Sequence, residues 1–290
     1  MSSVLIVQQV LNGLLDGVYY LLIALGLSLI FSLGGIVNLA HGAFYAIGAY
    51  FTVILAERFG FGGALVLSPV AVALFGILIE RFLFRRFYRR DPILSLLLTF
   101  GLAMVAEQAL RMIFGAAPLS YGIPDELRGQ FFIGDFVYSR YRTMLLGIAV
   151  LCVIGLWLLL NRTAFGRVVR AGVQNPDMVG ALGISLEPYM ATVAALGIGL
   201  AGLAGVLLAP IYSVFPTMGR DFILLAFTVV IVGGMGSIWG CVFAGLLLTQ
   251  VQALASLVIS PIWTDPIVFG TMVFFLMVRP QGLFGRLGHA

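Results

Sequence analysis

The chain lacks lysine altogether, since all 16 of its basic residues are arginines. A common P-loop needs a lysine that reaches the nucleotide phosphates, so this chain is not expected to bind ATP in that way. It also has only two histidines, His41 and His289, and neither an HExxH nor a GxSxG pattern. We therefore expect no catalytic residue, no metal site and no cofactor of its own, which argues against an enzyme.

Cysteine and charge are also scarce. Both cysteines, Cys152 and Cys241, fall in apolar runs, and we expect small core residues rather than a disulfide or a metal pair. The first 57 residues hold no basic residue, and no short apolar run with a small-residue cleavage site is evident, so we expect no cleaved signal peptide. Only 10% of the residues are charged, which argues against a soluble globular protein.

Apolar residues, in contrast, make up 61% of the chain, and the mean hydropathy is +1.12. Several runs reach about 20 residues, the length that a helix needs to cross the roughly 30 Å hydrocarbon layer of a membrane. Backbone groups in lipid must be hydrogen-bonded internally, and the runs lack the period-two alternation of a barrel strand. The sequence therefore predicts an all-α fold, a polytopic transmembrane helical bundle.

Eight or nine spans are expected, in a single transmembrane domain over residues 1–290. The candidate runs lie at residues 10–31, 42–56, 64–84, 93–114, 143–161, 188–210, 222–235, 240–258 and 266–279. The run 42–56 is too short to span comfortably, so we expect it to be tilted or re-entrant. The 36 glycines predict close helix packing, for example along Gly197, Ala201 and Gly205 or at Gly236 and Gly240. No internal sequence repeat is visible.

The arginines fall unevenly on alternate loops. Ten lie on one side: Arg81, Arg85, Arg86, Arg89, Arg90, Arg162, Arg167, Arg170, Arg279 and Arg286. Five lie on the other side: Arg58, Arg128, Arg140, Arg142 and Arg220. Because short cytoplasmic loops hold the excess of basic residues, we expect the N-terminus outside and the C-terminus in the cytoplasm.

Two connecting segments stand out from the apolar runs. The polar segment at about 161–188 is placed in the cytoplasm by this orientation, and we expect it to dock a partner. The outer loop, about 115–142, combines acidic and aromatic residues, namely Asp125, Glu126, Asp135, Phe131, Phe132, Phe136 and Tyr138. This composition fits an interfacial lid or an ordinary connector with aromatics at the headgroup level.

Few polar groups interrupt the apolar runs. Glu107 and Arg111 are four residues apart with the acid first, which predicts an ion pair on one helix face. Asp16 either lines a polar pathway or reaches toward the outer surface. Asn38 and His41, flanked by glycines, fit a broken helix that faces a cavity, or a cytoplasmic turn in which Asn38 caps the next helix.

Five segments of the chain, in order and over nearly its whole length, resemble LivH-type permeases of branched-chain amino-acid ABC importers. They read NLAHGAFYAIGAY, RTAFGRVVRAGVQNPDMVGALGIS, GLAGLAGVLLAPIYSVFPTMG, VVIVGGMGSIWGCVFAGLLL and RPQGLFG. The resemblance implies a helical bundle of the branched-chain amino-acid/ribose ABC permease type in the bacterial inner membrane. It also implies three kinds of partner besides membrane lipid: a second, LivM-like permease, two cytoplasmic ATPase subunits that bind the ATP, and a periplasmic solute-binding protein. Nucleic acid is not expected.

The resemblance also assigns the polar segment as the coupling region that docks on the ATPase. The residues carried over to this role are Arg170, Ala171, Asn175, Asp177, Gly183 and Ile184. Pro176 and Gly180 stand where helix formers are common in the family, but Pro176 fits a first helical turn behind an Asn175 cap.

The implied mechanism is alternating access, in which the ATPases move the coupling helix. Asp16, Asn38 and His41 are the residues that we expect to form the polar part of the translocation pathway. Three alternatives stay open: the same importer class for urea, amides or another small solute, an ATP-independent channel or ion-driven carrier, and a membrane enzyme or structural subunit.

Overall fold

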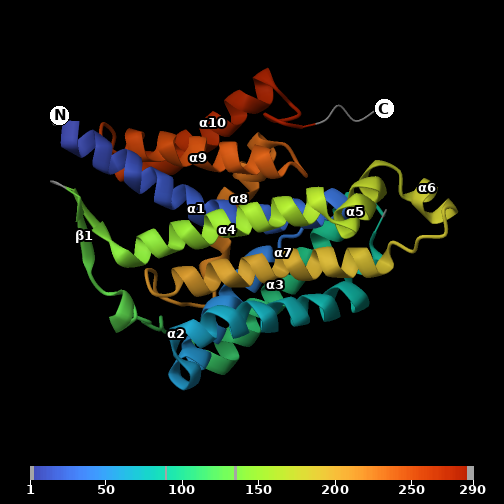
Figure 1. Cartoon of the computed structure of the whole chain (residues 1–290), viewed down its shortest axis with the longest axis horizontal. Helices are drawn as coiled ribbons and strands as arrows, with labels where there is room; N and C mark the ends of the chain where they lie inside the picture. The colour runs from blue at the N-terminus through green and yellow to red at the C-terminus, as the bar shows by residue number, and fades with distance from the viewer. Residues whose placement is uncertain (1–2, 89, 134–135, 286–290) are drawn as a thin grey trace.

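The computed structural model describes residues 3–88, 90–133 and 136–285, so Arg89, Asp135, Arg286 and His289 lie outside the described part. Apart from one short hairpin, the regular secondary structure of this part is helical, which confirms the all-α prediction. Its α-helices are α1 (Ser3–Gly34), α2 (His41–Phe82), α3 (Pro92–Phe114), α4 (Arg140–Arg162), α5 (Ala164–Gln174), α6 (Pro176–Ala181), α7 (Glu187–Leu208), α8 (Met218–Gly233), α9 (Ile238–Ala255) and α10 (Thr264–Val278). The long helices lie side by side in an elongated bundle (Figure 1).

Six described helices are long and apolar enough to cross a membrane, namely α1, α2, α3, α4, α7 and α9. The runs predicted at 222–235 and 266–279 fall on α8 and α10, which have only 16 and 15 residues. Helix length therefore supports a multi-pass membrane protein but does not confirm eight or nine spans.

The runs 42–56 and 64–84, predicted as separate spans, belong to one 42-residue helix, α2, which is broken at Gly60. Gly60 has φ 68° and ψ 175°, a conformation that only glycine adopts easily. The break leaves an arm before and an arm after Gly60, about 28 and 33 Å long at 1.5 Å per residue. Both arms pack on α7, with Gly48 against Gly202 and Gly76 against Ile198.

The re-entrant feature lies in residues 35–40 rather than in 42–56. After α1 ends, this non-helical segment returns into the bundle, so that the His41 ring reaches the carbonyl oxygen of Ile23 at 3.0 Å. Ile23 is about 17 Å from the end of α1, a distance of roughly half the thickness of a 30 Å hydrocarbon layer. The Thr99 hydroxyl on α3 holds the segment, accepting from Leu39 N–H at 3.1 Å and donating to Val37 C=O at 2.9 Å.

Pairs of glycines relate the two halves of the chain, although no repeat is visible in the sequence. A Cβ on Gly26 would lie 2.4 Å from the carbonyl oxygen of Gly197, and one on Gly197 would lie 2.6 Å from that of Gly26. Gly42 and Gly219 show the same reciprocal contact, at 2.3 and 2.1 Å. Because α1 and α7 run in opposite directions (Figure 1), these contacts indicate an internal two-fold arrangement of α1–α2 with α7–α8, the pattern of inverted repeats.

The two ends of the bundle differ. At one end, called the hairpin end, strands β1 (Gln130–Ile133) and β2 (Phe136–Ser139) form an antiparallel pair next to the N-terminal part of α1 (Figure 1). A short 3-10 helix, Asp125–Leu127, precedes the strands. The opposite end, called the α5–α6 end, carries those two helices, 3-10 helix Phe84–Arg86 and the turn between α8 and α9. A third 3-10 helix, Pro261–Trp263, precedes α10.

Candidate functional site

The polar segment folds into two short helices whose ends are fixed by local hydrogen bonds. Thr163 Oγ1 accepts from Gly166 N–H at 3.1 Å and so caps α5. Asn175 ends α5 and begins α6, where its Oδ1 accepts from Met178 N–H at 3.0 Å. Pro176 occupies the first position of α6, as expected behind this cap. The amphipathic helix α5 buries Gly166, Val169 and Gly172, which seats it on the bundle.

Gly183 and Ile184 terminate α6 in a Schellman motif. Ile184 N–H donates to Val179 C=O at 3.3 Å, and Gly183 N–H donates to Gly180 C=O at 2.9 Å. Gly183 has φ +79°, so the motif requires a residue that tolerates the left-handed conformation. These two residues therefore set the direction in which the chain leaves α6.

The α6 helix projects from the end of the bundle (Figure 1). The helix and the residue that follows it present large apolar side chains. Met178 is 59% exposed and Leu182 is 71% exposed. Ala171 and Asp177 are exposed on the same pair of helices. Met178 and Leu182 were missed in the sequence analysis, although apolar residues in an otherwise polar segment are a usable signal. An exposed apolar patch rimmed by polar residues is typical of a protein-interaction surface.

The Asn175 cap is expected to hold α6 in place. Asn175→Ala removes the side-chain acceptor, and loss of an N-cap typically costs about 1 kcal/mol. We expect faster amide hydrogen exchange in residues 176–181, measured by mass spectrometry, with little change in α3. Asn175→Asp keeps the acceptor and serves as the control. Equal exchange in Asn175→Ala and in the unchanged protein would contradict this role for the cap.

The loop before α3 is tied to the same end of the bundle. Arg85 forms an ion pair with Glu187 at the start of α7. The Tyr88 hydroxyl donates to Glu80 Oε1 at 3.2 Å, which joins the loop to α2. Burial raises the pKa of the Tyr88 phenol, and the adjacent Glu80 carboxylate raises it further, so Tyr88 stays a neutral hydrogen-bond donor.

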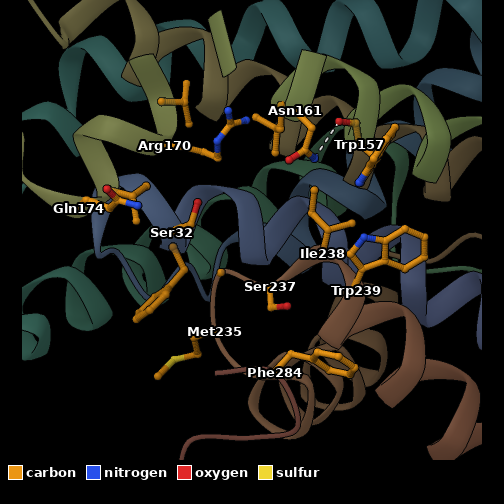
Figure 2. Close-up of a pocket in the computed structure, with 15 residues that line it drawn as sticks. Ser32, Trp157, Asn161, Arg170, Gln174, Met235, Ser237, Ile238, Trp239 and Phe284 are labelled. Carbon is orange, nitrogen blue, oxygen red and sulfur yellow. Dashed lines mark hydrogen bonds between the residues drawn. The ribbon is translucent and has the colours of Figure 1, made fainter. Parts of the chain in front are cut away.

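Arg170 lies away from the exposed face of α5. Its side chain borders a cavity of about 380 Å³ between α1, α4, α5 and the turn before α9, and Figure 2 shows it pointing toward Asn161. Its Nη1 atom is buried and has no hydrogen-bond partner. Arg170 is therefore close in sequence to the other predicted coupling residues, but its side chain faces this cavity and not the exposed surface of α5 and α6.

Asn38 and His41 lie together in the middle of the bundle. Both are 0% exposed, so a solvated cytoplasmic turn with Asn38 as a cap is wrong, and α2 has Ala40 at its N-cap. Neither polar atom of the Asn38 side chain has a hydrogen-bond partner, and the same holds for His41 Nδ1 and the Tyr45 hydroxyl. The first turns of α2 and α8 meet here at Gly42 and Gly219. Sequence reasoning missed Tyr45, whose position depends on the broken helix.

Asp16 is separated from this cluster. It lies on α1 about 10 Å along the helix axis from Ile23, toward the hairpin end. Arg142 is within electrostatic range of Asp16 and also donates to Asn12 Oδ1 at 3.3 Å. The predicted pathway residues therefore fall in two groups, Asp16 near the hairpin end and Asn38 with His41 near the middle.

The predicted ion pair of Glu107 with Arg111 is wrong. Glu107 on α3 instead accepts two hydrogen bonds from Arg220 on α8, with Nε at 2.7 Å from Oε1 and the second from Nη2 to Oε2. Arg111 is exposed. Spacing along one helix identified a possible partner for Glu107, but Arg220, 113 positions further along the chain, is the bidentate partner.

The side chains that commonly bind metals, and the two cysteines, form no further site among the described residues. No group of three or more His, Cys, Asp or Glu side chains in this part of the chain is arranged to hold a metal ion. Cys152 and Cys241 are free thiols, the latter buried.

Comparison with known proteins identifies the family. A family model described as the permease component of the branched-chain amino acid transport system matches residues 9–277. BraD, a high-affinity branched-chain amino acid transport system permease protein of Pseudomonas aeruginosa, is 30% identical over 96% of this chain and 95% of its own length. The LivH protein of Escherichia coli K12 is 29% identical over 96% and 95%, and LivM of the same strain is 25% identical over 91% and 67%. No solved structure matches the chain. The chain therefore belongs to the family of permease components of branched-chain amino acid transport systems.

Proposed function

We propose that this chain is the transmembrane permease subunit of an ATP-driven importer of leucine, isoleucine and valine. It pairs with a second, LivM-like permease, and it receives mechanical work from two cytoplasmic ATPase subunits while a solute-binding protein delivers the amino acid. The observation that carries the coupling role is α6, a projecting helix with exposed Met178 and Leu182 and with capped ends. The similarity to branched-chain amino acid permeases over 96% of the chain supports the substrate class.

The α5–α6 end is proposed to face the cytoplasm of a bacterial cell. This end gathers described arginines from two distant segments, with Arg81, Arg85, Arg86 and Arg90 in one and Arg162, Arg167 and Arg170 in the other. The Arg85–Glu187 ion pair ties the first segment to the start of α7. An excess of basic residues on one side of a membrane protein marks the cytoplasmic side. The hairpin end, with the N-terminal part of α1, then faces outward.

Movement of α5–α6 is proposed to reach the core through α7 and α1. Phe165 on α5 stacks on Tyr189 in the first turn of α7, with ring centroids 5.6 Å apart. Further along, α7 crosses α1 at Gly26 and Gly197, where the two backbones touch. Small residues at such a crossing let one helix shift against the other as a rigid body.

The polar cluster at the meeting point of α2 and α8 is proposed to line the pathway when the bundle opens. An amino acid carries a carboxylate and an ammonium group, and helix N-termini favour negative charge. Asn38, His41 and Tyr45 offer unpartnered polar atoms beside the first turns of both helices. We assign the carboxylate to this cluster, whereas Asp16, about 10 Å away along α1, attracts the ammonium group at an earlier point of the pathway near the hairpin end.

Coupling is tested by changing the end of α6. In Gly183→Val, a β-branched residue must adopt φ +79°, so we expect α6 to be redirected and ATP hydrolysis stimulated by the loaded binding protein to fall about tenfold. Gly180→Ala is the matched control, because it lies in the same helix with no atom near its Cβ position and should keep normal stimulation. The measurement uses the assembled transporter in proteoliposomes. Normal stimulation in Gly183→Val would contradict the docking role.

The substrate class and the energy source are tested with the same proteoliposomes. Uptake of labelled leucine should require ATP and all subunits, and unlabelled isoleucine and valine should compete with it. Competition by urea or acetamide instead would favour the other solute classes. Saturable leucine uptake by this chain alone would contradict the ATP-driven mechanism.

A further inference from the structure

The cavity beside Arg170 has the chemistry of an anion site. Arg170 and the side chains of Ser32, Ser237 and Asn161 border it, and none of the fifteen lining residues that the structure describes is acidic (Figure 2). Arg170 Nη1 is buried without a hydrogen-bond partner, a costly state for a guanidinium group. The cavity also adjoins the N-terminus of the 18-residue helix α9, whose first N–H groups and dipole favour negative charge.

A second, wholly apolar groove continues from this cavity. It has a volume of about 320 Å³ and lies between α1, α4 and α9, and Trp239 borders both spaces. Along α4 the two linings form one face of the helix: Leu146, Ala149, Val150, Val153 and Ile154 border the groove, and Trp157, Leu160 and Asn161 border the cavity. The combined surface is therefore cationic at the α5–α6 end and apolar further into the bundle.

We propose that this surface binds one anionic phospholipid from the membrane leaflet at the α5–α6 end. The phosphate group lies between Arg170 and the start of α9, and an acyl chain lies in the groove along α4. From Asn161 back to Leu146 the face extends about 22 Å, enough for a headgroup and the roughly 15 Å hydrocarbon depth of one leaflet.

The residues at the rim fit a lipid better than a soluble anion or a peptide. Trp157 and Trp239 lie where the cationic cavity meets the apolar groove, and tryptophan favours the boundary between headgroups and hydrocarbon. Arg162 stacks on the Trp157 ring at 5.8 Å and adds a second positive charge at the rim. A soluble phosphate would leave the groove empty, and an acidic peptide would bury its backbone polar groups against an apolar wall.

The test is native mass spectrometry of the full chain, purified in mild detergent and incubated with phosphatidylglycerol or with phosphatidylcholine. We expect one retained phosphatidylglycerol per chain and weaker retention of phosphatidylcholine. Arg170→Gln should reduce phosphatidylglycerol retention about tenfold, as expected for loss of a charge-assisted contact. Arg167→Gln, on the same helix but outside the cavity lining, is the matched control and should change retention less than about twofold.

The groove is tested separately, so that the proposal stays testable even if Arg170→Gln does not fold. Val150→Trp fills the groove at a residue that is 47% exposed, and Leu151→Trp adds the same ring next to it, outside the groove lining. We expect loss of the lipid in Val150→Trp only. Equal retention of both lipids, equal loss in each variant and its control, or displacement of phosphatidylglycerol by millimolar inorganic phosphate would overturn the proposal.

Discussion

Gly42→Ala is expected to abolish transport and to destabilise the protein. The added Cβ would lie 2.3 Å from the carbonyl oxygen of Gly219, whereas ordinary contacts begin at 3.4 Å. The first turns of α2 and α8 would have to separate by about 1 Å, and overpacking of this kind costs about 1–3 kcal/mol. The cost falls toward the upper end of that range, because both contacting groups are backbone and cannot change rotamer.

The measurement is ATP-dependent uptake by the assembled transporter, together with the thermal unfolding midpoint of the chain in detergent. Gly219→Ala should behave like Gly42→Ala because it enters the same contact from the other side. Adding the second substitution to the first should cost less than the first alone, because both alanines strain the same contact and one separation of the helices accommodates both. Gly101→Ala is the control: it lies within α3 with no atom near its Cβ position, and alanine favours helix there. Normal uptake by Gly42→Ala would refute the close approach of the two helices.

Arg220→Ala is expected to have the second largest effect, a loss of about 3 kcal/mol in the free energy of unfolding. The Glu107 side chain is only 11% exposed, so without Arg220 its carboxylate is left nearly buried and unpaired. This value lies at the lower end of the range for breaking a buried ion pair. The Arg220 side chain is 62% exposed, so the pair is only partly shielded from its surroundings. Denaturant unfolding, followed by circular dichroism, measures the change.

Two further variants separate the ion pair from general effects of charge. Combining Glu107→Gln with Arg220→Ala removes the stranded charge and should recover most of the lost stability. Arg111→Ala removes an exposed arginine one turn from Glu107 and should change stability little. If Arg111→Ala destabilises the protein as much as Arg220→Ala, the pairing predicted from helix spacing would be the relevant one.

The features read correctly from the sequence depend on neighbours within a few residues. Runs of apolar residues predicted the helices, and Asn175 before Pro176 predicted the start of α6. The glycine rows predicted close helix contacts, which Gly197 and Gly205 make with α1 and α2. Membership of the permease family was also readable, because several motifs occur in order along the chain.

The features that the sequence left open depend on residues far apart in the chain. Asn38 and His41 fitted either a solvated turn or a cavity, and only the return of residues 35–40 into the bundle made them fully buried. The internal two-fold arrangement is not visible in the sequence because it needs only helices that run in opposite directions and small residues where they cross. Tyr45, Met178 and Leu182 became candidates once their burial or exposure was known.

By itself, the sequence determined that this is a helical membrane protein of the branched-chain amino acid permease family with a capped polar segment. The helical membrane class follows from composition, the family follows from motifs in order along the chain, and the caps follow from hydrogen bonds between residues at most five positions apart. Only the tertiary structure decided that Glu107 pairs with Arg220, that Arg170 faces a cavity and that α2 meets α8 at two glycines. The Glu107–Arg220 and Gly42–Gly219 contacts join residues more than a hundred positions apart, and the Arg170 cavity combines residues of separate segments of the chain. The angles and depths at which helices pack are not encoded in local periodicity.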